Sequence, residues 1–291
     1  MNTDELMAQV RRLRIVIGRR VDEIFAGEYH SAFRGLGMEF SEVREYQPGD
    51  DVRAIDWNVT ARTGRPFVKR FQEERELTVV LLADLSASGR FGTASRIKQE
   101  MVAELCAVMA LAAQKNNDNV GLMIFTDRVE LHLPPDKGMR HTMRIIREAL
   151  SFEATSHGTD IGAALDELSK VQRRRAVVFL ISDFLDDNYE QPLRRVATRH
   201  DLVALRIVDP AERALPASGM LLVRDAETGE LRSIDASSKS VRNAYGRRAS
   251  AHASSVERIF TRAGVDHATL TCGQPYVNAL LELFRRRERK R

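Results

Sequence analysis

The stretch Leu77-Thr78-Val79-Val80-Leu81-Leu82-Ala83-Asp84-Leu85-Ser86-Ala87-Ser88 decides the fold. Its first seven residues are mostly aliphatic and predict a β-strand that is buried on both faces. A D-x-S-x-S triplet, Asp84, Ser86 and Ser88, follows this strand directly. One carboxylate and two hydroxyls at the carboxyl end of a buried strand are hard oxygen ligands at the edge where open α/β sheets bind ligands. The stretch therefore predicts a cation site at the edge of a sheet.

Strands alternate with helical runs downstream of this stretch, which is typical of a doubly wound, Rossmann-like α/β sheet. The Asp127-Arg128 pair predicts that the third strand forms a hairpin with the second. A second hairpin, inserted near 218–236, is indicated by a turn at Glu227-Thr228-Gly229-Glu230. The strands are expected at 77–84, 119–126, 129–133, 176–182, 202–208 and 267–271, and the helices at 95–114, 139–150, 161–171, 189–200, 240–263 and 276–286.

The residues before Leu77 have a different pattern. Apolar residues recur at helical spacing from Leu6 to Ile24, which predicts an amphipathic helix. The segment from Gly27 to Glu76 is rich in turn formers that separate short strands such as 67–71. We therefore expect two parts: an N-terminal helix with a small β-rich module over 1–76, and a metal-binding α/β domain over 77–291.

Two further residues are expected to complete the cation site. Thr159 lies just before the helix predicted at 161–171, and Asp183 follows the strand predicted at 176–182. In a doubly wound order the first and fourth strands lie side by side, so their carboxyl ends form one crevice. The predicted ligand set is Asp84, Ser86, Ser88, Thr159 and Asp183.

This set carries at most two negative charges, so a divalent cation bound there keeps positive charge. Mg²⁺ prefers octahedral oxygen coordination and commonly retains waters, one of which a carboxylate from another protein can replace. Mn²⁺ suits the same ligands, and the sequence does not distinguish the two ions. The pattern thus favours a non-catalytic, metal-dependent protein-binding function.

Other interpretations of the same residues were weighed. Ser86 and Ser88 can instead cap a helix, with Asp183 forming a turn. A metal-dependent phosphatase or phosphotransferase of the haloacid-dehalogenase type is the main alternative function, although Ser86 stands where such enzymes place an acid/base carboxylate. Ser88 lacks the glycine and histidine context of a serine hydrolase, and the histidines are expected at the surface or satisfied in the core. The chain has no phosphate-binding P-loop motif, so we expect no ATP hydrolysis.

Composition limits the remaining possibilities. The net charge of the 291 residues is +4, and six of the last seven residues are basic, which we interpret as a solvated helix end and not as a nucleic-acid site. The two cysteines, both expected in packed elements, suggest neither disulfides nor a zinc site. An acidic start without a long apolar run predicts a soluble, cytoplasmic protein.

At its five oxygen ligands the chain resembles the von Willebrand factor A fold with its metal-ion-dependent adhesion site (MIDAS), over Leu77 to about Phe284. The string Gly49 to Trp57, with 39–40, 44–46 and 61–64 around it, resembles the bacterial domain-of-unknown-function family fifty-eight (DUF58). This resemblance implies an adaptor that acts with a MoxR-type AAA+ ATPase in chaperone-like remodelling or maturation of protein complexes.

The N-terminal string also has a structural interpretation of its own. Its aspartates, with Arg53 and Arg62, are expected to form an ionic network that fixes an irregular loop, and Trp57 is expected to anchor the loop in apolar surroundings. A surface for the ATPase is the alternative. The aspartates are Asp50, Asp51 and Asp56.

Overall fold

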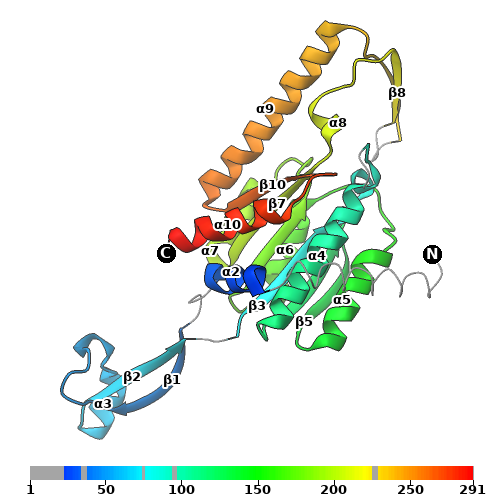
Figure 1. Cartoon of the computed structure of the whole chain (residues 1–291). Coiled ribbons are helices and arrows are strands. Elements are labelled where there is room, and N and C mark those ends of the chain that lie inside the picture. Colours follow the sequence, from blue (N-terminus) through cyan, green and yellow to red (C-terminus); the bar gives the residue numbers. More distant parts are fainter. Residues whose placement is uncertain (1–22, 34–37, 74–75, 94–96, 225–228, 291) are drawn as a thin grey trace.

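A six-stranded sheet forms the centre of the computed structural model, which describes residues 23–33, 38–73, 76–93, 97–224 and 229–290 (Figure 1). The elements are, in chain order, α2 (Glu23–Phe33), β1 (Met38–Glu45), the 3-10 helix η1 (Val52–Ala54), α3 (Trp57–Thr63), β2 (Phe67–Glu73), β3 (Thr78–Asp84), the 3-10 helix η2 (Ala87–Arg90), α4 (Lys98–Lys115), β4 (Asn119–Phe125), β5 (Val129–Asp136), α5 (Met139–Ser151), α6 (Ile161–Val171), β6 (Val177–Ser182), α7 (Glu190–Arg199), β7 (Asp201–Val208), α8 (Pro210–Arg213), β8 (Met220–Arg224), β9 (Leu231–Asp235), α9 (Lys239–Ala263), β10 (Asp266–Thr271) and α10 (Val277–Arg289). The helix expected from Leu6 to Ile24 lies almost entirely outside the described residues.

The order of the strands confirms the predicted doubly wound α/β fold. The central sheet runs β10-β7-β6-β3-β4-β5, and all neighbours are parallel except β4 and β5. The antiparallel pair β4 and β5 is the hairpin that Asp127-Arg128 predicts. Strands β3 and β6, the first and fourth strands expected from the sequence, lie side by side. Their carboxyl ends therefore meet at one edge of the sheet.

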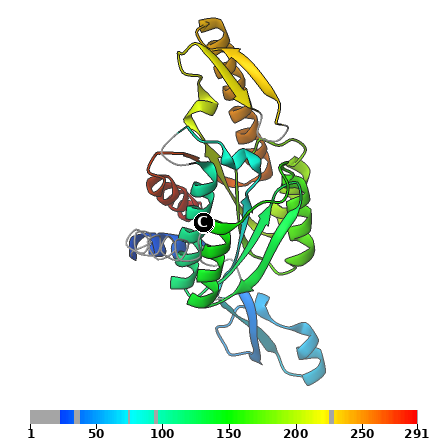
Figure 2. The same cartoon turned by 90° about the vertical axis from the view of Figure 1, so that its right-hand side faces the viewer.

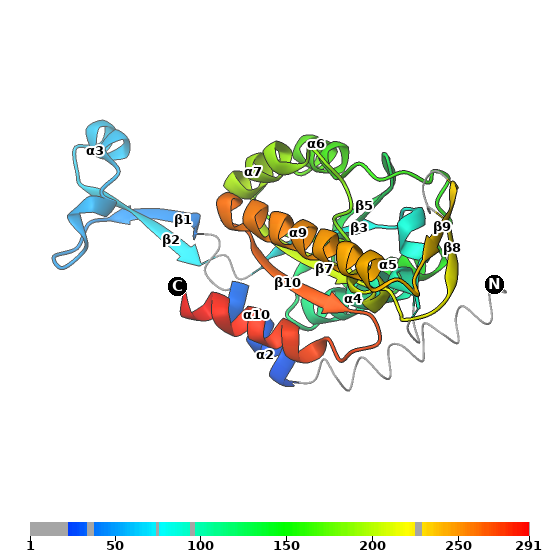
Figure 3. The same cartoon turned by 90° about the horizontal axis from the view of Figure 1, so that it is seen from above.

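Helices cover both faces of this sheet, and β3 explains why (Figure 3). Side chains alternate along a strand, and both alternating sets of β3 are buried. Val79, Leu81 and Ala83 join a core with α2, α4, α5 and α10, whereas Val80 and Leu82 join a second core with α6, α7 and α9. The two cores fix the strand on both faces, which holds its carboxyl end in place.

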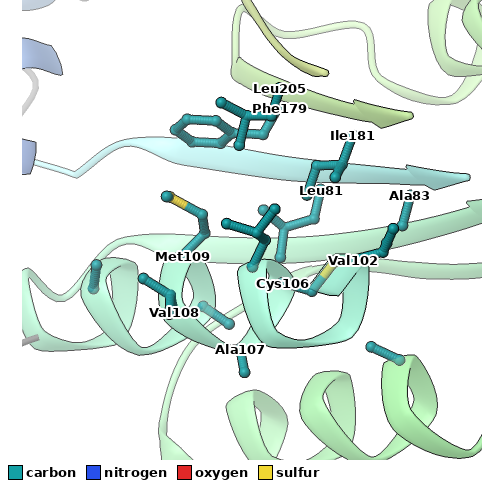
Figure 4. Close-up of a cluster of buried hydrophobic side chains, with 14 of the residues drawn as sticks. Leu81, Ala83, Val102, Cys106, Ala107, Val108, Met109, Phe179, Ile181 and Leu205 are labelled. Carbon is teal, nitrogen blue, oxygen red and sulfur yellow. The ribbon is translucent and has the colours of Figure 1, made fainter. Parts of the chain in front are cut away.

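Helix α4 is buried along most of its length. Its residues from Met101 to Ala113 are all buried, because the sheet lies on one side and the helices α5, α10 and α2 pack around it. Small side chains such as Ala107 let these neighbours approach closely. Figure 4 shows Val102, Cys106 and Met109 facing the strand residues of this core. Both cysteines, Cys106 and Cys272, are buried and free, as the sequence predicts.

Two parts of the chain project from opposite ends of the central sheet (Figures 1 and 2). The antiparallel strands β1 and β2 and helix α3 extend beyond its amino end. The antiparallel hairpin of β8 and β9, where the sequence predicts an insertion, extends beyond its carboxyl end with the start of α9. The two projections therefore offer separate surfaces.

The predicted role of Trp57 is wrong. This side chain is 67% exposed, so it does not anchor the N-terminal module. The aspartates also have other partners than those expected: Asp50 pairs with Arg44, at 2.6 Å between Oδ1 and Nη2. Asp51 accepts from the backbone N–H of Arg53, and Asp56 is the N-cap of α3. Local capping and the Arg44–Asp50 ion pair therefore help to order this loop.

The basic C-terminal helix is not simply solvated, contrary to the interpretation from the sequence. Arg287 is 5% exposed and donates to the carboxylates of Asp201 and Asp266, at the starts of β7 and β10. Its guanidinium also lies 4.6 Å from the ring centroid of Phe33 in α2. An arginine with these partners joins α10 to the sheet and to α2.

Among the helices of the described residues, none has both the length and the apolar character needed to span a membrane.

A buried carboxylate fixes the start of β3. Asp118 accepts from the backbone N–H of Leu77 at 2.9 Å and from the hydroxyl of Tyr29 at 3.2 Å. Burial raises the pKa of Asp118 to about 6 despite these hydrogen bonds. Because the folded chain binds this proton more tightly than the unfolded chain, its contribution to stability is lost as the pH rises from about 4 through 6.

We predict that Asp118→Asn stabilises the fold above pH 6, by on the order of 2 kcal/mol at pH 8, because it removes a desolvated charge and keeps the shape of the side chain. The gain should shrink as the pH falls to 4. Urea unfolding at several pH values measures it, with Asp136→Asn, at an exposed carboxylate, as the control. A gain that does not change with pH would contradict this explanation.

Candidate metal site

The D-x-S-x-S triplet folds into a buried turn at the end of β3. The Oδ1 atom of Asp84 accepts from the backbone N–H of Ser86 at 3.0 Å. The hydroxyls of Ser86 and Ser88 lie 3.0 Å apart. Asp84, Ser86 and Ser88 are 5%, 1% and 7% exposed. Three oxygen-bearing side chains therefore converge within one turn, at a depth where polar groups need partners.

Asp183 lies beside this turn, at the end of β6. The hydroxyl of Ser182 donates to Oδ2 of Asp84 at 2.6 Å and so joins the two strand ends. Burial and the charge of Asp183 raise the pKa of Asp84 to about 7, although Ser182 and Ser86 donate to it. Two carboxylates are thus buried close together, which is an unfavourable arrangement unless a cation is near.

Thr159 lies in the loop that passes next to the triplet. The carbonyl of His157 accepts from the backbone N–H of Ala87 at 3.2 Å, which joins this loop to the turn after β3. The backbone N–H of Asp160 bonds to the carbonyl of Thr126, at the end of β4. Thr159 is half-buried between these two anchors. The loop is therefore held next to the residues that the sequence predicts as its partners.

Glu130 in β5 orders the first part of the same loop. Its carboxylate accepts from Thr126 and from backbone and hydroxyl groups of Thr155, and from the N–H of Ser156. Although burial alone would raise it, these hydrogen bonds lower the pKa of Glu130 to about 2. The chain leading to Thr159 is thus fixed at both ends.

A lysine that the sequence analysis did not identify lies at the centre of the site. The ammonium of Lys98, in the first turn of α4, is 2.6 Å from Oδ2 of Asp183 and 2.6 Å from Oε1 of Glu212 in α8. Its side chain is 2% exposed. Burial alone would lower the pKa of Lys98, but the two carboxylates overcome this effect and raise it. Lys98 is therefore a built-in cation that neutralises part of the acidic cluster.

The helix-capping interpretation of Ser86 is not supported by these contacts. Ser86 stands at the N-cap position of η2 but its side chain makes no capping hydrogen bond. Asp186, in the acidic run that resembles dehalogenase chemistry, accepts from the backbone N–H of Ile161 at the start of α6. Asp183 does accept from the N–H of Leu185, so its role as a turn former holds alongside its other contacts.

The residues present fit a hard divalent cation. Among the described residues, no group of three or more histidine, cysteine or acidic residues is arranged to hold a metal ion. Hydroxyl and carboxylate oxygens instead supply the donors, as Mg²⁺ prefers. Both oxygens of Asp183 already have partners, Lys98 and the N–H of Leu185, whereas the hydroxyls of Ser86 and Ser88 contact each other.

The sequence analysis did not identify Lys98, Ser182 and Glu212 as members of the site, although Lys98 and Glu212 each leave a signal in the sequence. Residues 209–212 read D-P-A-E, a capping-box pattern, and Asp209 and Glu212 form that box at α8. A lysine in the first turn of a helix opposes the helix dipole, so Lys98 needs an acidic partner. Nothing in the sequence says which carboxylate that partner is.

The fold and the site place this protein in the class of doubly wound α/β domains, with an oxygen-lined acidic cluster at the carboxyl edge of the sheet. Residues 42–255 match the model of the family described as "Protein of unknown function DUF58". The chain belongs to this family. An uncharacterized protein of Mycobacterium bovis, Mb1516, is 32% identical over 290 residues, which cover 98% of this chain and 90% of the relative. YeaD of Bacillus subtilis is 26% identical over 51% of this chain and 35% of its own length.

Solved structures with similar folds are more distant. BatB of Bacteroides thetaiotaomicron is 15% identical, with a TM-score of 0.49 over 73% of this chain and 99% of that chain. The VWA domain of SpRpn10 is 16% identical, with a TM-score of 0.38 over 72% of this chain and 95% of that chain.

We predict that Lys98→Met lowers the free energy of unfolding by about 3 kcal/mol in the absence of metal, because it leaves Asp183 and Glu212 without their cation. Urea unfolding in chelator measures the loss. Lys170→Met is the matched control: its ion pair with Glu167 is exposed, so it should leave stability nearly unchanged. Equal effects of the two substitutions would show that Lys98 is not needed to neutralise the cluster.

Proposed function

We propose that this protein is a non-catalytic adaptor that binds a divalent cation, Mg²⁺ or Mn²⁺, at the carboxyl edge of its sheet and uses it to bind an acidic side chain of a partner protein. The observation that supports this proposal best is the buried cluster of carboxylates and hydroxyls around Asp84. Burying these carboxylates and hydroxyls together does not by itself stabilise the fold, so a bound cation is the simplest reason for the arrangement.

The ligands that we assign are the residues predicted from the sequence. Asp84, Ser86 and Ser88 would contact the ion directly, and Thr159 would approach it from the neighbouring loop. Asp183, whose Oδ2 already pairs with the ammonium of Lys98 at 2.6 Å, would act through water. A cation held by one direct carboxylate and neutral hydroxyls keeps positive charge for a carboxylate from outside.

We further propose that the partner system includes a MoxR-type AAA+ ATPase, as the family resemblance implies. The two projecting parts of the chain suit an adaptor, because the candidate metal site and the β1–β2 module lie at opposite ends of the sheet. One end can bind an acidic client while the other, with Trp57 exposed, contacts the ATPase. The chemistry would then be ATP hydrolysis by the partner, with no covalent step on this chain.

We predict that the wild-type chain binds Mg²⁺ and that Asp84→Asn weakens this binding at least about tenfold, because the substitution removes the only direct negative ligand. Isothermal titration calorimetry measures the affinity. Asp187→Asn, at an exposed carboxylate in the loop after β6, is the control and should bind Mg²⁺ as the wild type does. If Asp84→Asn titrates like the wild type, the metal is bound elsewhere or not at all.

Affinity purification from the native cell extract tests the partner. We expect an AAA+ ATPase, identified by mass spectrometry, with the wild-type chain, and a client protein that is lost when chelator is added or Asp84→Asn is used as bait. Recovery of the same proteins in equal amounts with and without chelator would contradict a metal-dependent adaptor. Phosphate release from a phosphomonoester by the purified chain would favour the phosphatase alternative.

A further inference from the structure

A pocket adjoins the candidate metal site on the side of α9. It has a volume of about 690 Å³ and lies between α9, α8 and the carboxyl ends of β7 and β10. Three arginines line it: Arg206 from β7, Arg213 from α8 and Arg248 from α9. Leu185, whose N–H donates to Asp183, also lines it. The pocket and the metal site therefore share the loop after β6.

The pocket continues a row of polar side chains across the edge of the sheet. In the parallel register Arg206 lies opposite Ser182 of β6 on one side and Thr269 of β10 on the other. Laterally paired residues point to the same face of a sheet. Ser182 in turn donates to Asp84. The row thus leads from the proposed metal ligand, through Ser182, to the guanidinium in the pocket.

Arg206 is buried without a counterion. It is 7% exposed, and its one hydrogen bond is a long one, from Nε to the carbonyl of Asp183 at 3.4 Å. No carboxylate of the described residues lies within ion-pair distance of its guanidinium. Burial lowers the pKa of Arg206 despite the negative charges of Glu212 and Asp183 nearby. The terminal nitrogens of Arg206 reach solvent and make no ion pair within the described residues, so the guanidinium is available to an anion from outside.

The two carboxylates in the rest of the lining, Glu212 and Glu257, form no ion pair with these arginines within the described residues. Glu212 uses one oxygen for Lys98 and the other for the backbone N–H of Asp209. Arg213 and Arg248 are exposed and make no ion pair within the part of the chain that the structure describes. The Nε2 atom of His252, also in the lining, is buried without a hydrogen-bond partner. The pocket therefore presents several donors and excess positive charge.

We propose that this pocket binds a carboxylate of an acidic segment of the partner protein. Guanidinium groups bind carboxylates through two parallel hydrogen bonds, and a desolvated arginine makes the strongest of these pairs. This inference rests on the proposed function, because we assign both carboxylates, the one at the metal and the one in the pocket, to the same segment of the partner protein. Arg206 is the central donor, with Arg213 and Arg248 at the mouth of the pocket.

Fluorescence anisotropy with a short, fluorescein-labelled polyglutamate peptide tests the pocket in the presence of chelator, where the metal contributes nothing. Arg206→Met should weaken binding at least about tenfold. Arg248→Met, at an exposed position that leaves the fold intact, should weaken it about threefold. The control is Arg258→Met, an exposed arginine of α9 outside the pocket, with a change below about twofold.

The outcomes separate the pocket from the proposed function. If Arg206→Met does not fold, the contrast between Arg248→Met and Arg258→Met decides. The pocket proposal would be wrong if Arg248→Met bound the peptide as tightly as the wild type does. It would also be wrong if Arg258→Met lost as much affinity as Arg248→Met, because the binding would then reflect only general attraction between charges. Adding Mg²⁺ should strengthen binding of the peptide to the wild type but not to Asp84→Asn. If Mg²⁺ does not strengthen peptide binding while the other results are as expected, the metal-dependent function is wrong and the proposed binding pocket is unaffected.

Discussion

The repulsion between two buried carboxylates, Asp84 and Asp183, determines how the carboxyl edge of this sheet is built. Strands β3 and β6 bring them together because the doubly wound order makes these strands neighbours. Ser182 joins the strand ends, and Lys98 neutralises the acid on its side with help from α8. Lys98 pairs with Asp183 and Glu212 but not with Asp84, so Asp84 is the carboxylate that a bound divalent cation would balance.

The same edge separates charges of opposite sign. Acidic groups and hydroxyls gather around the end of β3, whereas unpaired arginines gather around the end of β7, two strands away in the sheet. A cation at the first place and an arginine pocket at the second would both attract acidic groups. An acidic segment could therefore be recognised at two points, which gives specificity that one ion alone does not. The long helix α9 supplies most of the lining of the arginine pocket, with α8 beside it.

The sequence was sufficient for the doubly wound fold class, for the neighbouring positions of β3 and β6 and for the β4–β5 hairpin, because buried parallel strands leave strong apolar runs with oxygen side chains at their ends. It was insufficient where a partner decides a residue's role. The basic helix end that includes Arg287 reads as solvated, but Arg287 is buried against acids that are distant in the chain. Lys98 is buried in the same way, and the sequence does not identify its partners. Trp57 reads as an apolar anchor, yet its side chain is 67% exposed. Arg206 sits in an apolar strand pattern, and only the register reveals the pocket that it faces.

The most direct test of the central claim is the crystal structure of the chain grown with Mn²⁺, with the ion located by its anomalous scattering. The account predicts one ion in direct contact with oxygens of Asp84, Ser86 and Ser88, with Lys98 still bound to Asp183. An acidic edge without an ion, or an ion bound only to groups elsewhere on the chain, would contradict it.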